Sequence, residues 1–275
     1  MGSKLSTNEK SENHCKPSKS DVQEFIKGIK PLDLLVFKGT GVTSNVIIKA
    51  EEWVTGFTDA PSHVEVMITK EWCDKIKTYE GISIEVDQPL SWGSTTLGKS
   101  ISIETGGHVN GVQIRDLEYL ITKYLSNPTS NVGYCSLRDN PTQFSPDKES
   151  LTHYLIRKDR IQENLRISYD KYHDKEYNNN PLALIGVMFP QFRYLRNVSQ
   201  ENYENYGNDG NGNKLFCSEF IATLYEDLGI INDMTDGVAD GKMLDPRDVL
   251  PVDFFGPDAD RQFVNAICNQ PVWFR

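Results

Sequence analysis

The order of apolar patterns along the 275 residues constrains the fold more than any other feature of this sequence. The first half carries short apolar or alternating segments typical of β-strands, at 32–37, 63–69, 82–86, 100–104, 112–114 and 132–137. Two longer segments with helical periodicity follow, at about 148–172 and 217–228. Strands followed by helices predict an α+β domain, with a largely antiparallel sheet packed on the two long helices. Shorter helices are expected after Ser20, which can cap one, and at about 43–54.

The segment 63–69 has the clearest strand pattern. Its even-numbered residues are apolar and share one face, whereas His63, Glu65 and Met67 share the other. His63 opens the strand directly after Pro61-Ser62. We therefore expect its side chain at one end of the sheet, either as a hydrogen-bonded structural histidine or as a functional group.

Composition excludes several classes of protein. A net charge of −10 and a pI near 5.1 argue against a nucleic-acid binder, because an acidic surface repels phosphate. No apolar run approaches the roughly 20 residues of a membrane span, and the N-terminus lacks the apolar core of a secretion signal. The five cysteines are odd in number and scattered, which argues against a disulfide framework or a zinc site. A cytoplasmic, reducing location is expected, with no metal or other cofactor.

The first 20 residues read as a disordered tail that precedes one domain over 21–275. The tail begins Met-Gly-Ser-Lys-Leu-Ser, which fits the pattern for N-myristoylation of Gly2. Its four lysines against two glutamates would favour an anionic membrane. The sequence therefore predicts peripheral membrane attachment through Gly2, with an ordinary start or a cloning remnant as the alternative.

A phosphate-binding pattern occurs at Gly93–Ser100, which satisfies G-x-x-x-x-G-K-[ST]. A working P-loop needs a buried strand before it and a helix starting at the Lys-Ser pair. Here Pro89 interrupts the expected strand upstream, and Ile101 and Ile103 read as a short strand downstream. A Gly/Ser-rich hairpin loop is the favoured interpretation, and nucleotide binding is the weaker alternative.

Cys217 is the cysteine most suited to chemistry, because it falls in the first turn of the helix expected at 217–228. Unpaired N–H groups and the helix dipole stabilise a thiolate there, and the same N–H groups could hold an oxyanion. A thiol nucleophile also needs a base, usually a histidine that is oriented by a third polar residue. The alternative is that Cys217 is a small buried apolar residue.

Four segments together resemble the permuted NlpC-type, YiiX-like papain-fold proteins, which are related to lecithin–retinol acyltransferases and to a poxvirus protein group. The segments are PLDLLVF at 31–37, SHVEV at 62–66, IET at 103–105 with GVQI at 111–114, and FCSEF at 216–220. In that family the histidine strand precedes the cysteine helix. The resemblance covers roughly residues 25–255, although 177–214 match poorly and Asp33 stands where the family often has Gly-Asp.

The resemblance implies a cysteine hydrolase or acyltransferase that acts on an amide or ester, in a peptide or a lipid, through a thioester. Cys217 would be the nucleophile, His63 the base, and Glu104 the residue that orients His63. Glu65, on the same strand face as His63, is the alternative third member. A non-catalytic, membrane-tethered interaction protein with the same fold is the alternative function.

Overall fold

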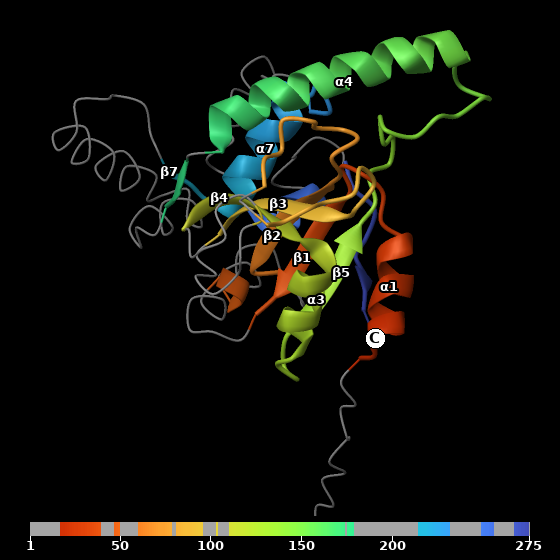
Figure 1. The fold of residues 1–275 in the computed structure, drawn as a ribbon. Coiled ribbons are helices and arrows are strands. Elements are labelled where there is room, and N and C mark those ends of the chain that lie inside the picture. The colour runs from red at the N-terminus through yellow and green to blue at the C-terminus, as the bar shows by residue number, and fades with distance from the viewer. Residues whose placement is uncertain are drawn as a thin grey trace, which may run out of the picture.

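The structure is a computed structural model that describes residues 17–39, 47–49, 60–78, 81–95, 103, 110–173, 175–178, 214–231, 249–255 and 267–274. These residues form an α+β fold around a six-stranded sheet (Figure 1). The strands are β1 (Leu34–Lys38), β2 (His63–Ile68), β3 (Leu90–Thr95), β4 (Gly111–Asp116), β5 (Asn131–Cys135) and β8 (Val272–Trp273). Their order across the sheet is β4-β3-β2-β1-β5-β8, and every neighbouring pair is antiparallel. The predicted α+β class and antiparallel sheet are confirmed.

Helices cover both faces of the sheet (Figure 1). On one face, α7 (Cys217–Asp227) lies between the sheet and the long helix α4 (Leu151–Tyr172). On the other face lie α1 (Lys19–Lys27) and α3 (Leu117–Leu125). Two two-residue strands, β6 (Glu176–Tyr177) and β7 (Lys214–Leu215), pair in parallel beside β4, and a short 3-10 helix spans Pro251–Phe254.

The alternation predicted for β2 separates two apolar cores. Val64, Val66 and Ile68 belong to the larger core, which packs against α7. Met67 belongs to the smaller core beneath α1 and α3. Consecutive side chains of a strand point to opposite faces, so His63 and Glu65 lie on the same face as Met67, the α3 face. They are at the first end of β2, a strand that α7 contacts.

Several predicted boundaries and elements need correction. The first helix begins two residues earlier than expected, because Ser18 rather than Ser20 is its N-cap. Residues 82–86 are not a strand: Val86 is 61% exposed, and the segment runs along the surface without a ladder partner. Of the helix expected at 43–54, residues 47–49 are helical, and of the strand expected at 100–104, Ile103 alone is described.

Two of the longer elements, β3 and α3, were missed, as were the short strands β6, β7 and β8 and the 3-10 helix. β3 contains only two large apolar residues, yet all six of its residues are buried, because it lies between β2 and β4. α3 follows β4 directly, where Asp116 accepts a hydrogen bond from the Tyr119 N–H at 2.7 Å and caps the helix. The Ser/Gly-rich composition of β3 resembles a loop, and only its position in the sheet explains its burial.

Candidate active site

Cys217 is the first residue of α7, and the chain before it is held firmly against the sheet. Ser94 of β3 donates a hydrogen bond to the carbonyl oxygen of Leu215 at 2.8 Å. Phe216 is extended, and its N–H donates to the Glu219 carboxylate at 3.1 Å. The thiol group therefore occupies a defined place at the N-terminus of a buried helix, beside β2 and β3.

His63 is fixed at the start of β2 by its neighbours. It pairs with Phe37 of β1, and the two ring centroids lie 5.6 Å apart. The Ser62 N–H donates to the Phe37 carbonyl at 2.9 Å, and the Ser62 hydroxyl accepts from the Gly39 N–H at 3.1 Å. The imidazole is 12% exposed, so it is screened from bulk water on most sides.

Cys217 and His63 lie close enough to interact directly. Burial opposes ionisation of the Cys217 thiol, but the thiol pKa is lowered overall, and the charge of His63 and a hydrogen bond to its side chain contribute most to the lowering. The N–H groups of Val64 and Ser218 also donate to the sulfur and act in the same direction. A buried thiol that ionises more readily than an ordinary one is suited to act as a nucleophile.

The second ring nitrogen of His63 contacts Glu65. His63 Nε2 donates to Glu65 Oε1 at 2.6 Å, which leaves Nδ1 for the Cys217 sulfur. Glu65 is completely buried, and its Oε1 also forms an ion pair with the equally buried Arg115 of β4. Cys217, His63, Glu65 and Arg115 thus form a continuous line of interacting groups.

Gly93 of β3 makes room for the Glu65 side chain. A Cβ at this position would lie 2.5 Å from Glu65 Cγ and 2.9 Å from Glu65 Cδ, well inside normal contact distances. The first glycine of the P-loop pattern therefore has a packing role in this structure. Residues 93–95 belong to β3, which is paired with β4, and form neither a hairpin loop nor a phosphate-binding loop.

Two tyrosines lie near Cys217. Burial raises the pKa of Tyr124, on α3, to about 12, although the nearby charge of Arg115 lowers it; Tyr124 also interacts with Ser62 and with Cys217. Burial, and then the charge of Cys217, raise the pKa of Tyr177, whose ring packs edge-on against Phe216. Both phenols therefore stay protonated at neutral pH, as hydrogen-bond donors.

The remaining predicted site residues lie outside the described part of the chain. These are Glu104, Gly2 and the last five residues of the pattern at 93–100. Glu65, the predicted alternative third member, is described and contacts His63. Arg115 also belongs to this group of interacting residues and was not predicted. The available signal for Arg115 was the alternation along 112–115, which puts Gln113 and Arg115 on the face opposite Val112 and Ile114.

The other described cysteines, Cys73, Cys135 and Cys268, are free and buried. Burial raises the pKa of Cys73 to about 11 and also raises that of Cys135 and Cys268. Among the four described thiols, a lowered pKa is specific to Cys217.

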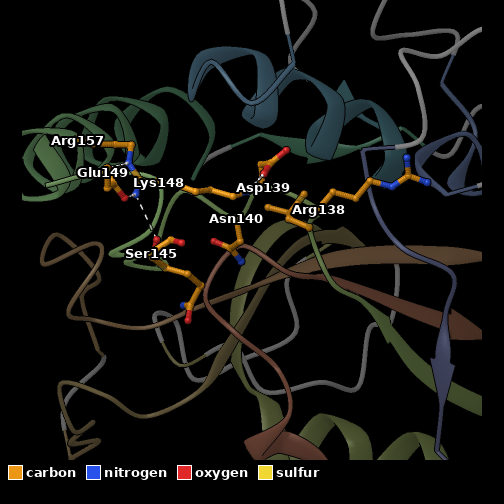
Figure 2. Close-up of a pocket in the computed structure, with 9 residues that line it drawn as sticks. Arg138, Asp139, Asn140, Ser145, Lys148, Glu149 and Arg157 are labelled. Carbon is orange, nitrogen blue, oxygen red and sulfur yellow. Dashed lines mark hydrogen bonds and ion pairs between the residues drawn. The ribbon is translucent and has the colours of Figure 1, made fainter.

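A cavity of about 420 Å³ opens between the segment after β5 and the start of α4 (Figure 2). Four of its charged residues pair with one another: Lys148 with Asp139 at 2.9 Å, and Arg157 with Glu149. None of its lining residues belongs to the Cys217–His63 site. The cavity is therefore separate from the contact between Cys217 and His63.

Within the described ranges, no group of three or more His, Cys, Asp or Glu side chains is arranged to hold a metal ion. In the same part of the chain, none of the helices combines the length and apolar character that crossing a membrane requires. Comparisons with models of known families, with curated proteins and with solved structures return no match.

Proposed function

We propose that this chain is a cysteine hydrolase or acyltransferase with a permuted papain-like fold, in which Cys217 attacks the carbonyl of an amide or ester. The observation that carries the proposal is the contact between Cys217, at the start of a buried helix, and His63, whose other nitrogen is held by Glu65. The order of the elements, with the histidine strand before the cysteine helix, supports the permuted fold.

The reaction follows from this geometry. His63 takes the thiol proton, and the thiolate attacks the carbonyl carbon to form a tetrahedral oxyanion. The backbone N–H of Cys217, in the first turn of α7, donates to that oxyanion. His63 then passes its proton to the departing amine or alkoxide, which leaves a thioester on Cys217. Water or an acceptor alcohol or amine, deprotonated by His63, attacks the thioester and restores the free thiol.

The substrate is a peptide or a lipid, since both carry the carbonyl that this intermediate requires. Peripheral membrane attachment through an acylated Gly2 belongs to the same proposal and would favour a lipid or a membrane protein. The mass of the N-terminal peptide after expression in a eukaryotic cell tests the acylation. An unmodified terminal glycine would remove this part without affecting the chemistry at Cys217.

The central test compares alkylation of Cys217 by iodoacetamide at pH 6 in the wild type, His63→Ala and the control His173→Ala, with site-resolved mass spectrometry. We expect Cys217 to react first among the cysteines, His63→Ala to slow it by at least about tenfold, and His173→Ala to have no effect. Turnover of activated ester and amide substrates should fall by roughly 10²–10⁴-fold in His63→Ala and disappear in Cys217→Ala. A Cys217 that reacts no faster than Cys73, with no effect of His63→Ala, would refute the proposal.

A further inference from the structure

Arg115 and Glu65 lie on different strands but share one face of the sheet. Arg115 is on β4, opposite Ser91 of β3, and Ser91 is opposite Met67 of β2. Glu65 is two residues from Met67 and lies against Gly93. Because next-but-one strands are about 10 Å apart, two long side chains are needed to bridge β3. The residues between them, Ser91 and Gly93, are small enough to let the guanidinium and the carboxylate meet over the strand.

Both charges are completely buried, which makes the pair costly. A buried ion pair is often no more stabilising than apolar residues of the same volume, whereas loss of one partner leaves an uncompensated charge. Burial lowers the pKa of Arg115 to about 9, with the nearby Tyr124 opposing the change. That value still leaves a guanidinium at neutral pH, and the ion pair with Glu65 favours the charged form further. Stability alone is therefore a weak reason for such a pair at this position.

The pair has a clear consequence for His63. A carboxyl group buried without a cation tends to become protonated, and a neutral carboxyl group no longer stabilises an imidazolium. Arg115 supplies that cation, and Glu65 Oε1 receives both Arg115 and His63. The positive charge of His63 in turn favours the thiolate of Cys217.

We infer that Arg115 is a positioning residue of the proposed thiol chemistry: across β3 it holds Glu65 as a carboxylate against His63, and through it promotes ionisation of Cys217. This inference rests on the proposed function and deepens it. Arg115 acts through Glu65, so its effect should depend on the carboxylate.

The test is a double-mutant cycle with Arg115→Met, Glu65→Gln and the double variant Arg115→Met/Glu65→Gln, which leaves no orphaned charge. The readout is the pH profile of Cys217 alkylation by iodoacetamide on the native full chain, with thermal unfolding as the measure of folding. Arg115→Lys, which keeps the positive charge, is the conservative variant. Arg166→Met is the matched control, because it removes a cation from a solvent-exposed pair with Asp74.

We expect Arg115→Met and Glu65→Gln each to slow Cys217 at pH 6 by about tenfold and to move the profile to higher pH. The double variant should match Glu65→Gln alone, Arg115→Lys should retain most of the rate, and Arg166→Met should equal the wild type. If Arg115→Met does not fold, two results still decide whether Arg115 acts on Cys217 through Glu65. These are the alkylation rate of Arg115→Lys and the comparison of the double variant with Glu65→Gln.

Lower melting temperatures with an unchanged pH profile in folded variants would overturn the inference and leave Arg115 a structural residue. An additional loss in the double variant beyond Glu65→Gln would also overturn it, because Arg115 would then act independently of Glu65. Failure of the proposed function looks different: wild-type Cys217 itself would react slowly, and His63→Ala would change nothing.

Discussion

Buried cysteines lie near both ends of helix α7, and their electrostatic surroundings are opposite. Cys217 begins the helix, and Tyr225, about 12 Å along it, lies near Cys135, Cys268 and Asp33. All three thiols are buried. Yet the pKa of Cys217 is lowered, whereas burial raises that of Cys135 and Cys268, with Asp33 adding to both shifts.

Burial alone therefore does not decide whether a thiol is inert. At the Cys217 end, an imidazole and backbone N–H groups face the sulfur. At the Tyr225 end, the charge of Asp33 opposes ionisation of Cys135 and Cys268, and the hydrogen-bond donors are directed to Asp33 and to a backbone carbonyl instead. The first end favours an ionised thiol, whereas at the second the donors satisfy Asp33 and a carbonyl, and each can be changed separately.

The largest effect is expected from Gly93→Ala, which would displace Glu65, the residue that contacts His63. The new methyl group would push Glu65 away from His63, because the Glu65 side chain is fully buried and cannot move into solvent. We expect Cys217 alkylation at pH 6 to slow by at least about tenfold and the free energy of unfolding to fall by about 1–3 kcal/mol.

The matched control is Gly28→Ala, whose methyl group would meet the hydroxyl end of Tyr134 at 2.9 Å, on a different part of the sheet. It should leave alkylation unchanged. Wild-type reactivity of Cys217 in a folded Gly93→Ala variant would show that the contact between Glu65 and His63 does not govern the thiol.

The sequence predicted those parts of the site that depend on local patterns. The alternation along 63–69 assigned the faces of β2, and the apolar stripe after Cys217 predicted α7 with the thiol in its first turn. The same alternation put Glu65 on the face of His63, which is why it was available as an alternative to Glu104.

The contact between Glu65 and Arg115 depends on strand register, which no local sequence pattern encodes. Arg115 meets Glu65 only because β2, β3 and β4 are adjacent and aligned so that Ser91 lies between Met67 and Arg115. β3 itself was missed, since its small polar residues resemble a loop until two strands bury them. A buried ion pair between residues 50 positions apart becomes visible only when the sheet is assembled.

Asp33→Asn should have a smaller effect and act on stability alone. Asp33 accepts hydrogen bonds from the N–H groups of Lys30 and Leu137 and from the Asn140 amide, so an asparagine NH₂ would face at least one donor. We expect a loss of about 1–3 kcal/mol in the free energy of unfolding at unchanged Cys217 alkylation.

The pH dependence of Asp33→Asn has a definite sign. Burial raises the pKa of Asp33, so the folded protein binds this proton more tightly than the unfolded chain. Its contribution to stability is therefore complete below the unfolded value near 3.8 and declines as the pH rises through the folded pKa. Urea unfolding from pH 3.5 upward should show the deficit of Asp33→Asn shrinking as the pH rises. A deficit that grows would mean that the carboxylate is the favoured form in the fold.

The smallest effect is expected from Tyr225→Phe, at the end of α7 opposite to Cys217. The Tyr225 hydroxyl donates to the buried carbonyl of Leu32 at 2.8 Å, and Leu32 has a positive φ of 70° that this contact helps to hold. Its loss should cost about 0.5–1.5 kcal/mol, while Tyr119→Phe, which removes an exposed hydroxyl, should cost close to nothing. Chemical unfolding checks both values.

Because the surroundings of Cys217 are local to the start of α7, the pH profile of its alkylation should not move in Tyr225→Phe. A shift in Tyr225→Phe alone would mean that α7 couples its two ends.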